Sequence, residues 1–249
     1  GKNPMTLFAG LGATSAVLML VFKDTITGLA AGVRLTSNDM LHKGDWITVK
    51  SVDANGIVED MSLTTVKVRN FDNTIVTISP TTLVNGSFQN WIGMQKSGGR
   101  RVKRVVYFDF RSVRLVDETL KRNLLAKHFA TEDSFKLKES LQKAIDKDIQ
   151  EGKDIEDLKN PAALAPTNLQ LYRKFMEKYL RQRPEVNTDL TLMVRHMEAT
   201  QCGLPIEFYF FIKDKVWVNY EHILAVIMAH AYALANEFGL KIYEQYPEQ

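Results

Sequence analysis

Cysteine is almost absent from this sequence. Of the 249 residues only Cys202 is a cysteine, so no disulfide can form within the chain, and a reducing compartment is indicated. An excess of one charge is also missing. The net charge of +3 at pH 7 is too weak to indicate a nucleic-acid partner. The mean hydropathy of -0.17 excludes a chain that lies in a membrane along its whole length.

Patterns that carry catalysis are missing as well. His222 and His230 fall on one predicted helix, but their spacing is not that of a metal-binding pair. Cys202 lies in a predicted turn without an identifiable base. Gly10 and Gly12 resemble part of a dinucleotide-binding loop, but no strand precedes them and the third glycine is absent. The sequence therefore predicts no enzyme, no cofactor and no metal site.

Charge is absent from the long apolar run at residues 5–22 (MTLFAGLGATSAVLMLVF). As a helix this run is about 27 Å long, close to the roughly 30 Å hydrocarbon core of a bilayer. Two interpretations stay open, a membrane helix and a buried core helix of a soluble protein. Small residues at helical spacing favour a membrane helix packed closely against copies of itself. They are Ala9, Gly12, Ala13 and Ala16.

The helical pattern continues beyond this run. Lys23 and Asp24 end the uncharged stretch, yet apolar residues resume at helical spacing, and Gly28 and Gly32 repeat the small-residue pattern. We therefore expect a helix kink at Lys23 and Asp24. It would separate a membrane-spanning half from an amphipathic half near the interface.

Short β-branched runs separated by turn residues follow the helix. Their number and length predict a small barrel of the SH3 or Sm-like type. The runs cover residues 45–50, 56–61, 63–69, 74–79 and 87–91. Residues 96–101 (KSGGRR) are typical of a linker and mark a domain boundary.

The rest of the chain predicts an α+β domain. Strands and helices alternate in the order β-α-β-β-α-β, which is ferredoxin-like. The predicted elements cover residues 104–110, 113–129, 189–197, 207–213, 218–238 and 241–243. A charged insert at about residues 131–187 interrupts this order. Its segment 168–181 has amphipathic spacing and predicts a packed accessory helix.

Three stretches resemble a known family. Residues 23–33 (KDTITGLAAGV) closely resemble the kinked second half of the pore helix in small-conductance mechanosensitive channels. Residues 42–47 (HKGDWI) are similar to the entry into that family's Sm-like β domain. Residues 74–80 (TIVTISP), with Asn85-Gly86 and Gln89-Asn90-Trp91, are similar to its closing strands. The insert and residues 208–211 resemble the bacterial miniconductance branch of the family.

The resemblance implies an architecture and a function. A pore-lining transmembrane helix with a kinked second half occupies residues 1–43, an Sm-like β domain 44–95, and a ferredoxin-like α+β cytoplasmic domain 96–249. The subunits would form a homo-oligomer, a heptamer, in the bacterial inner membrane, with further membrane helices in the full-length protein. Membrane tension would open the channel during hypoosmotic shock. The expected partners are lipids and permeating ions, with no nucleic acid.

The resemblance also places a constriction in the pore. Better-known members carry two leucine rings, and the matching positions here are Ala16 and Leu20. Leu20 is the expected main ring because Ala16 is too small to close much space, and Phe22 is the fallback if the register is off. This chain has Asp24 where those members have a glycine at the kink. The kink mechanics are therefore expected to differ.

Two functions of other classes compete with a channel. Sm-like barrels can bind RNA, and basic residues cluster near the predicted boundary at Lys96, Arg100, Arg101, Lys103 and Arg104. A soluble RNA-binding module would leave the apolar helix unexplained, and the cluster also fits a solvated linker or a charged strand edge. The second alternative is a membrane-tethered scaffold that does not conduct.

Overall fold

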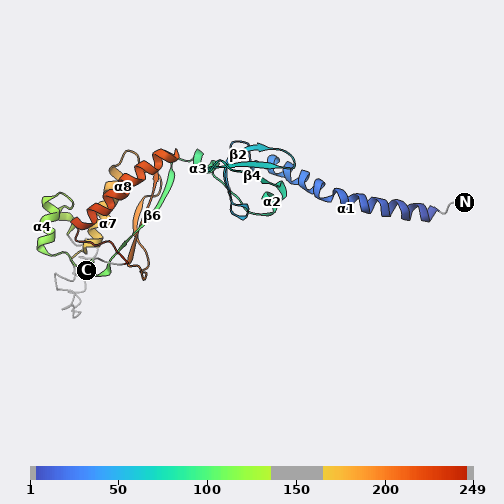
Figure 1. The fold of residues 1–249 in the computed structure, drawn as a ribbon. Helices are drawn as coiled ribbons and strands as arrows, with labels where there is room; N and C mark the ends of the chain where they lie inside the picture. The colour runs from blue at the N-terminus through green and yellow to red at the C-terminus, as the bar shows by residue number, and fades with distance from the viewer. Residues whose placement is uncertain (1–3, 136–164, 246–249) are drawn as a thin grey trace, which may run out of the picture. The chain divides into compact units, whose positions relative to one another are not determined.

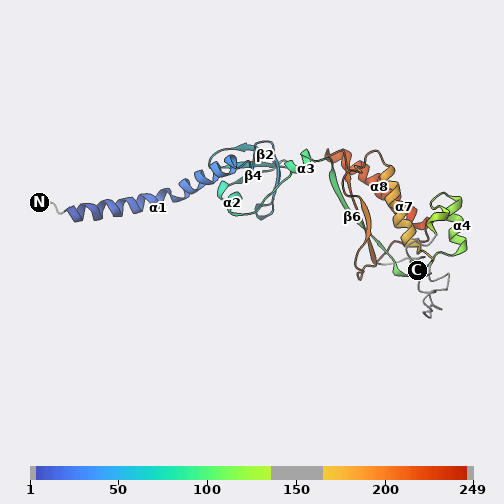
Figure 2. The ribbon, with the colours of Figure 1, turned by 180° about the vertical axis from the view of Figure 1, so that it is seen from behind.

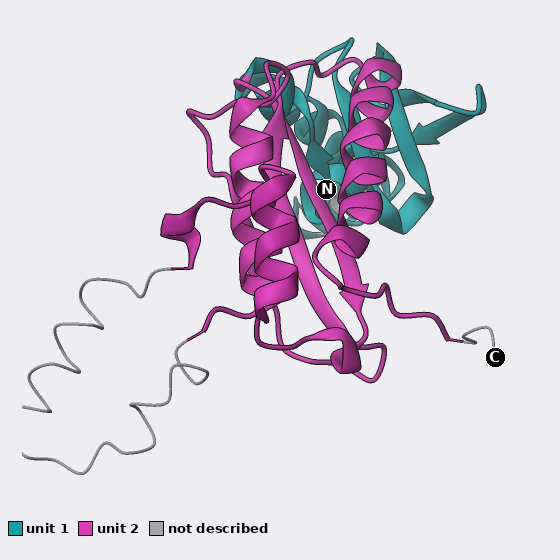
Figure 3. Cartoon of the chain, turned by 90° about the vertical axis from the view of Figure 1, so that its left-hand side faces the viewer, with its two compact units in different colours: residues 1–96 teal, residues 97–249 magenta. Residues whose placement is uncertain are grey.

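The computed structural model describes residues 4–135 and 165–245. The chain divides into two compact units, Gly1–Lys96 and Ser97–Gln249, which Figure 3 shows in separate colours. Each unit has its own cluster of buried apolar side chains. The chain therefore consists of an N-terminal apolar helix, which belongs to unit 1, followed by a β-containing part in each unit.

Unit 1 begins with one long helix, α1, which spans Pro4–Ser37 without a break. Lys23 and Asp24 lie inside it, and its ribbon changes direction part-way along (Figure 1). The helix ends where Asp39 takes a left-handed conformation with φ of 52°. There the Met40 amide donates to the Leu35 carbonyl at 3.0 Å. In two opposite views no other element of unit 1 lies beside the N-terminal half of α1 (Figures 1 and 2).

The rest of unit 1 is one antiparallel sheet with short helices. Its strands run in the order β4-β3-β2-β1-β5. They are β1 (Trp46–Val49), β2 (Ala54–Met61), β3 (Val66–Asn70), β4 (Ile75–Ile78) and β5 (Gln89–Asn90). The short helices are η1 (Lys50–Val52), α2 (Pro80–Asn85) and α3 (Ile92–Lys96). The five expected strands are confirmed, with ends that shift by a few residues.

The core of unit 1 lies on one face of this sheet. Alternate residues along the strands point to the same side, so Ile47, Val58 and Val68 are buried together. Leu35 at the end of α1 and Leu83 of α2 belong to the same cluster and are also buried. The sheet therefore holds the C-terminal end of α1 by apolar packing.

Unit 2 is a two-layer α+β structure. Its sheet has the antiparallel order β6-β8-β7. The strands are β6 (Arg100–Phe108), β7 (Met193–His196) and β8 (Leu204–Ile212). The helices are η2 (Phe110–Ser112), α4 (Glu118–Ala126), η3 (Glu132–Ser134), α7 (Asn168–Gln182) and α8 (Trp217–Glu237). Figure 3 shows the helices of unit 2 in front of its strands.

The described helix of the insert, α7, is part of the core of unit 2 and not the accessory helix that the sequence predicted. Tyr172 and Met176 of α7 are fully buried in the core of unit 2. The Tyr172 hydroxyl donates to the Ala231 carbonyl of α8 at 2.6 Å, and burial raises the pKa of this phenol. The helix α7 is thus a structural part of the α+β unit. The remainder of the insert, residues 136–164, lies outside the described residues.

Two boundaries in unit 2 differ from the sequence prediction. The first strand starts at Arg100, inside the predicted linker, because β6 pairs with β8 from Arg100↔Ile212 to Phe108↔Leu204. Most of the basic cluster therefore lies on this strand. The expected last strand is reduced to a single bridge, Phe108↔Ile242.

Candidate functional site

The N-terminal two-thirds of α1 is an uncovered apolar surface. Every residue from Phe8 to Thr27 is exposed, and Leu20 is 74% exposed. The segment Phe8–Ser37 is long and apolar enough to cross a membrane, with a mean hydropathy of 1.6 and only 17% of its apolar window buried. A core helix would be covered by its own chain, and no described residue covers this one. The helix therefore needs lipid or further copies around it.

The predicted constriction residues all lie on this uncovered part. Ala16 and Leu20 are one turn apart on α1, and Phe22 is 52% exposed. The three do not contact one another across the fold because they belong to a single helix. A ring of them would need further copies of the chain.

The predicted helix-packing residues fall into two groups. Ala9, Gly12 and Ala13 are exposed, and a Cβ placed on Gly12 or Gly28 would meet nothing within 4 Å. The three exposed positions leave room for a neighbouring helix, whereas Gly28 is buried in the single chain. Gly32 differs, because a Cβ there would overlap the Leu63 carbonyl oxygen of the loop between β2 and β3. Its small size is required inside the chain.

A threonine lies one turn beyond Lys23 of the predicted kink, and its hydroxyl bonds to the helix backbone as those of Thr14 and Thr36 do elsewhere in α1. The Thr27 hydroxyl donates to the Lys23 carbonyl at 2.8 Å, four residues earlier in α1. Such a bond competes with the amide that normally uses this carbonyl and often bends a helix. Thr27 was not singled out from the sequence, although its distance from Lys23 is that of a helical turn.

The end of α1 is fastened to the sheet by apolar contacts. Ala31 is 7% exposed and Leu35 is fully buried, one turn apart on α1, and Leu35 belongs to the same buried cluster as Leu83 of α2 and the apolar residues of the sheet. Leu41, just beyond the helix, is also fully buried in this cluster. The last turns of α1 are therefore part of the core of unit 1.

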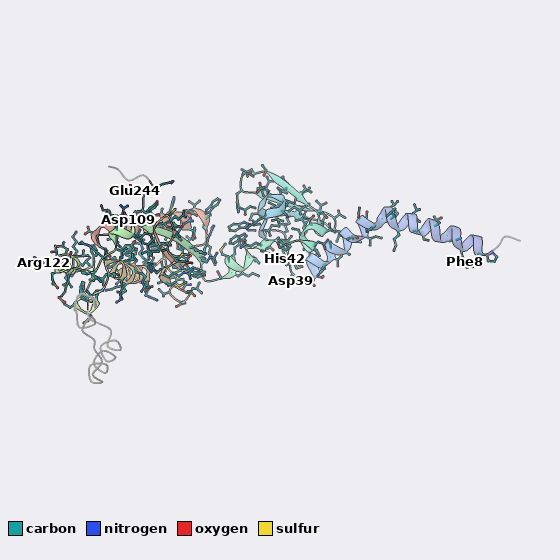
Figure 4. The ribbon with its side chains drawn as sticks, turned by 90° about the horizontal axis from the view of Figure 1, so that it is seen from below. Phe8, Asp39, His42, Asp109, Arg122 and Glu244 are labelled. Carbon is teal, nitrogen blue, oxygen red and sulfur yellow. The ribbon has the colours of Figure 1, made fainter. Side chains whose placement is uncertain are left out.

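Polar contacts join the same helix end to the sheet. The Asn90 side-chain amide on β5 donates to the Asp45 carboxylate at 2.8 Å and to the Met40 carbonyl at 3.2 Å. Asp45, only 6% exposed, also accepts from the His42 backbone amide at 3.0 Å. Figure 4 shows Asp39 and His42 where α1 meets the sheet. The sequence analysis used Asp45 and Asn90 only as parts of motifs and did not predict that they meet.

This arrangement has no chemistry of a metal site. Among the described residues no group of three or more histidine, cysteine, aspartate or glutamate side chains could hold a metal ion. His222 and His230 are both exposed on α8, and Cys202 is exposed in the turn before β8. The candidate site is an exposed apolar helix whose C-terminal end is buried in the core of unit 1.

Comparison with protein families matches residues 24–93 to the β domain of mechanosensitive ion channels. Two curated relatives come from Methanocaldococcus jannaschii. The small-conductance mechanosensitive channel MscMJ is 33% identical over 90 residues, which is 36% of this chain and 25% of the relative. The large-conductance mechanosensitive channel MscMJLR is 29% identical over 134 residues, 53% of this chain and 36% of the relative. The chain thus matches about a third or less of each relative's length.

Solved structures share the fold at low identity. The closed state of Helicobacter pylori MscS matches 100% of this chain and 74% of that chain, with a TM-score of 0.61 and 14% identity. Arabidopsis thaliana MSL1 matches 97% of this chain and 66% of that chain, with a TM-score of 0.63 and 10% identity. The likeness extends over both units and the apolar helix.

Proposed function

Because this chain is a member of the small-conductance mechanosensitive channel family, whose proteins are ion channels and not enzymes, we propose that it is a subunit of a tension-gated channel. In this proposal α1 lines the pore and channel opening relieves hypoosmotic shock. The observation that carries the proposal is the division of α1. Residues Phe8–Thr27 are uncovered and mostly apolar, whereas Ala31 and Leu35 are buried. One end of the helix can follow the membrane while the other is held.

The proposed assembly is a heptameric ring in the bacterial inner membrane. Ala9, Gly12, Ala13 and Gly28 would allow adjacent copies of α1 to approach closely, since small residues carry helix contacts in lipid. In a ring these contacts are head-to-tail and involve two different sides of each helix. Gly32 would contribute less to these contacts, because the Leu63 backbone already occupies its side of the helix. Lipids and permeating ions would be the other partners.

The proposed domains follow the two units. The sheet of unit 1 would form the Sm-like domain at residues 44–95, after the pore helix at residues 1–43. Unit 2 would form the ferredoxin-like cytoplasmic domain at residues 96–249, since the order β6-β8-β7 with the Phe108↔Ile242 bridge corresponds to its strand arrangement. A likeness to the miniconductance branch stays part of the proposal.

The proposed gate is an apolar ring. Copies of Leu20 would narrow the pore, with Ala16 one turn away and Phe22 as the alternative ring. Water leaves such a constriction, and ions cannot cross without their hydration shells. The proposed hinge is at Lys23 and Asp24, where the Thr27 hydroxyl occupies the Lys23 carbonyl.

Current recording under stepped tension tests this function. The full-length protein is placed in membranes that lack other tension-gated channels, and suction on a patch is raised in steps. We expect discrete currents that appear above a threshold tension and vanish when suction is released. A membrane-embedded ring without any current would favour the scaffold alternative. A protein extracted without detergent that binds RNA in low salt would favour the RNA-binding alternative.

A further inference from the structure

A hollow lies in unit 2 where the end of α4 meets α7. Figures 1 and 2 show these two helices side by side. The hollow holds about 420 Å³, and its described lining comes from residues 128–131, from Ser134 and from α7. Pockets for small ligands commonly measure about 300–1,000 Å³. The hollow therefore has the size of a small-molecule site, and it shares no residue with the proposed pore helix.

Two lysines of α7 give the hollow its charge. Lys174 and Lys178 line it, are exposed and lie one helical turn apart. Their neighbour Arg173 pairs with Glu177 on the same helix. Among the described residues the ammonium groups of Lys174 and Lys178 have no carboxylate partner. Like charges one turn apart repel each other, so an anion between the two lysines would be stabilising.

His128 brings an imidazole to the same hollow through an unusual backbone conformation. It follows the C-cap of α4 with φ of 58°, in the left-handed position that glycine usually takes after a helix. The Phe129 amide donates to the Leu124 carbonyl at 2.9 Å and closes this turn. The turn does not require an imidazole, whereas an anionic ligand can accept a hydrogen bond from one.

Aromatic side chains form the apolar wall of the hollow. Phe129, Phe175 and Tyr179 line it and are half-buried. The Phe129 and Phe175 rings meet edge to face with their centroids 5.2 Å apart. Tyr179 is stacked on His230 of α8 at 5.7 Å. These contacts hold the rings in place, and a flat ligand ring can lie on such a surface.

Neutral hydrogen-bonding groups complete the lining. The Thr131 and Ser134 hydroxyls lie 3.2 Å apart beside η3, and Gln182 comes from the end of α7. These groups can both donate and accept, which suits the hydroxyls and ring edges of a polar ligand. The two acids of η3, Glu132 and Asp133, do not line the hollow. No described residue that lines it is acidic, so its charge favours an anion.

We propose that this hollow binds a nucleoside monophosphate. The phosphate would lie between Lys174 and Lys178, and the base would lie on the rings of the aromatic wall. A phosphate monoester carries a charge of about −1.5 to −2 at pH 7, which two lysine ammonium groups neutralise. Every residue of the site belongs to one chain. The inference therefore goes beyond the proposed channel and does not depend on its ring.

Isothermal titration calorimetry of the full-length protein in detergent tests the site. The probes are the monophosphates of adenosine, guanosine, cytidine and uridine, with adenosine and inorganic phosphate as separate halves of one of them. We expect at least one nucleotide to bind with one site per chain. Each half should bind at least roughly tenfold more weakly, because it makes only part of the contacts. Added salt should weaken nucleotide binding, since the lysines are exposed.

Substitutions on α7 test the role of the two lysines. Lys174→Gln and Lys178→Gln should each weaken binding roughly tenfold, the loss expected for one charged contact. The matched control is Arg181→Gln, which removes an exposed basic residue of α7 outside the hollow and should leave binding unchanged. His128→Gly should also weaken binding. Glycine suits the left-handed position, so this variant should keep its thermal stability and separates ligand contact from folding.

Three results would overturn the proposal. The first is that none of the four nucleotides binds at millimolar concentration. The second is that inorganic phosphate binds as tightly as the nucleotides, because the aromatic wall would then contribute nothing. The third is an equal loss of binding in Lys174→Gln and Arg181→Gln, which would show general attraction to a basic surface instead of a site.

Discussion

Gly32 of α1 lies directly against the backbone of Leu63, so that a Cβ on Gly32 would overlap the Leu63 carbonyl oxygen. A backbone oxygen cannot rotate away as a side chain can. The last turns of α1 are therefore held on the loop between β2 and β3 by a contact that only glycine permits. Together with the buried Leu35, this contact fixes the end of the proposed pore helix.

Gly32→Ala should weaken this attachment. Overpacking against a rigid neighbour costs about 1–3 kcal/mol, which should appear as a lower free energy of unfolding for unit 1. The matched control is Gly28→Ala, where an added Cβ meets nothing within 4 Å. It should be neutral or slightly stabilising, since alanine favours a helix. Equal stability of the two variants would contradict the close contact.

Asn90→Ala should weaken the junction between α1 and the sheet by removing its polar contacts. The change removes the donors to the Asp45 carboxylate and the Met40 carbonyl. The Asp45 carboxylate keeps the His42 amide as a donor, so the cost is that of the lost hydrogen bonds, about 0.5–1.5 kcal/mol each and more for the bond to the charged carboxylate. Hydrogen exchange at residues 35–41 should accelerate, whereas Asn85→Ala, exposed at the end of α2, should leave it unchanged. Unchanged exchange in Asn90→Ala would mean that packing alone fixes the helix end.

Thr27→Val should alter the bend of α1. Valine keeps the shape of the side chain but removes the hydroxyl that donates to the Lys23 carbonyl. The carbonyl then accepts only its helical amide, and we expect a straighter helix and a shifted tension threshold in patch recordings. Thr25→Val, two residues away and also exposed, is the control and should keep the threshold. A shift of the same size in both variants would argue against a specific role for Thr27.

Tyr172→Phe should change how the stability of unit 2 depends on pH. At neutral pH the lost hydrogen bond to the Ala231 carbonyl costs about 1 kcal/mol. Burial raises the pKa of Tyr172, so the folded state retains a proton that the unfolded state releases above about pH 10. The stability of the unsubstituted protein should therefore fall as pH rises beyond that value, and less steeply in Tyr172→Phe. Parallel unfolding curves for the two proteins between pH 9 and pH 11, roughly one unit either side of that value, would contradict the assignment.

Much of the fold could be predicted from local patterns. The β-branched runs and turn residues gave all five strands of unit 1, and helical spacing gave α7 and α8. The place of α7 could not be predicted, because amphipathic spacing shows that a helix packs but not what it packs on. Its Tyr172 reaches Ala231, far away in the sequence. The start of β6 at Arg100 was missed since its pairing with Ile212 outweighs the local glycines and charges.

Only part of the candidate site could be predicted from the sequence. Apolar composition was enough to find the uncovered segment of α1. The junction between α1 and the sheet could not be predicted, because Asp45, just before β1, and Asn90 on β5 are distant in the sequence. Gly32 was predicted to pack against another helix, and its contact with the Leu63 carbonyl depends on a loop whose position no spacing rule gives. The roles of Leu20, Ala16 and Phe22 stay predictions, because a ring needs more than one copy.

Resting current through Leu20→Ser channels is the measurement that tests the central claim most directly. The full-length protein is recorded in patches at zero suction, beside the unsubstituted channel and Phe22→Ser. A hydroxyl in place of the apolar side chain should keep water in the constriction. We therefore expect Leu20→Ser to conduct without tension and to impair growth without osmotic shock. Leu20→Ser channels that stay closed at rest and open at the normal tension, while Phe22→Ser channels leak, would place the gate at Phe22 and contradict the account.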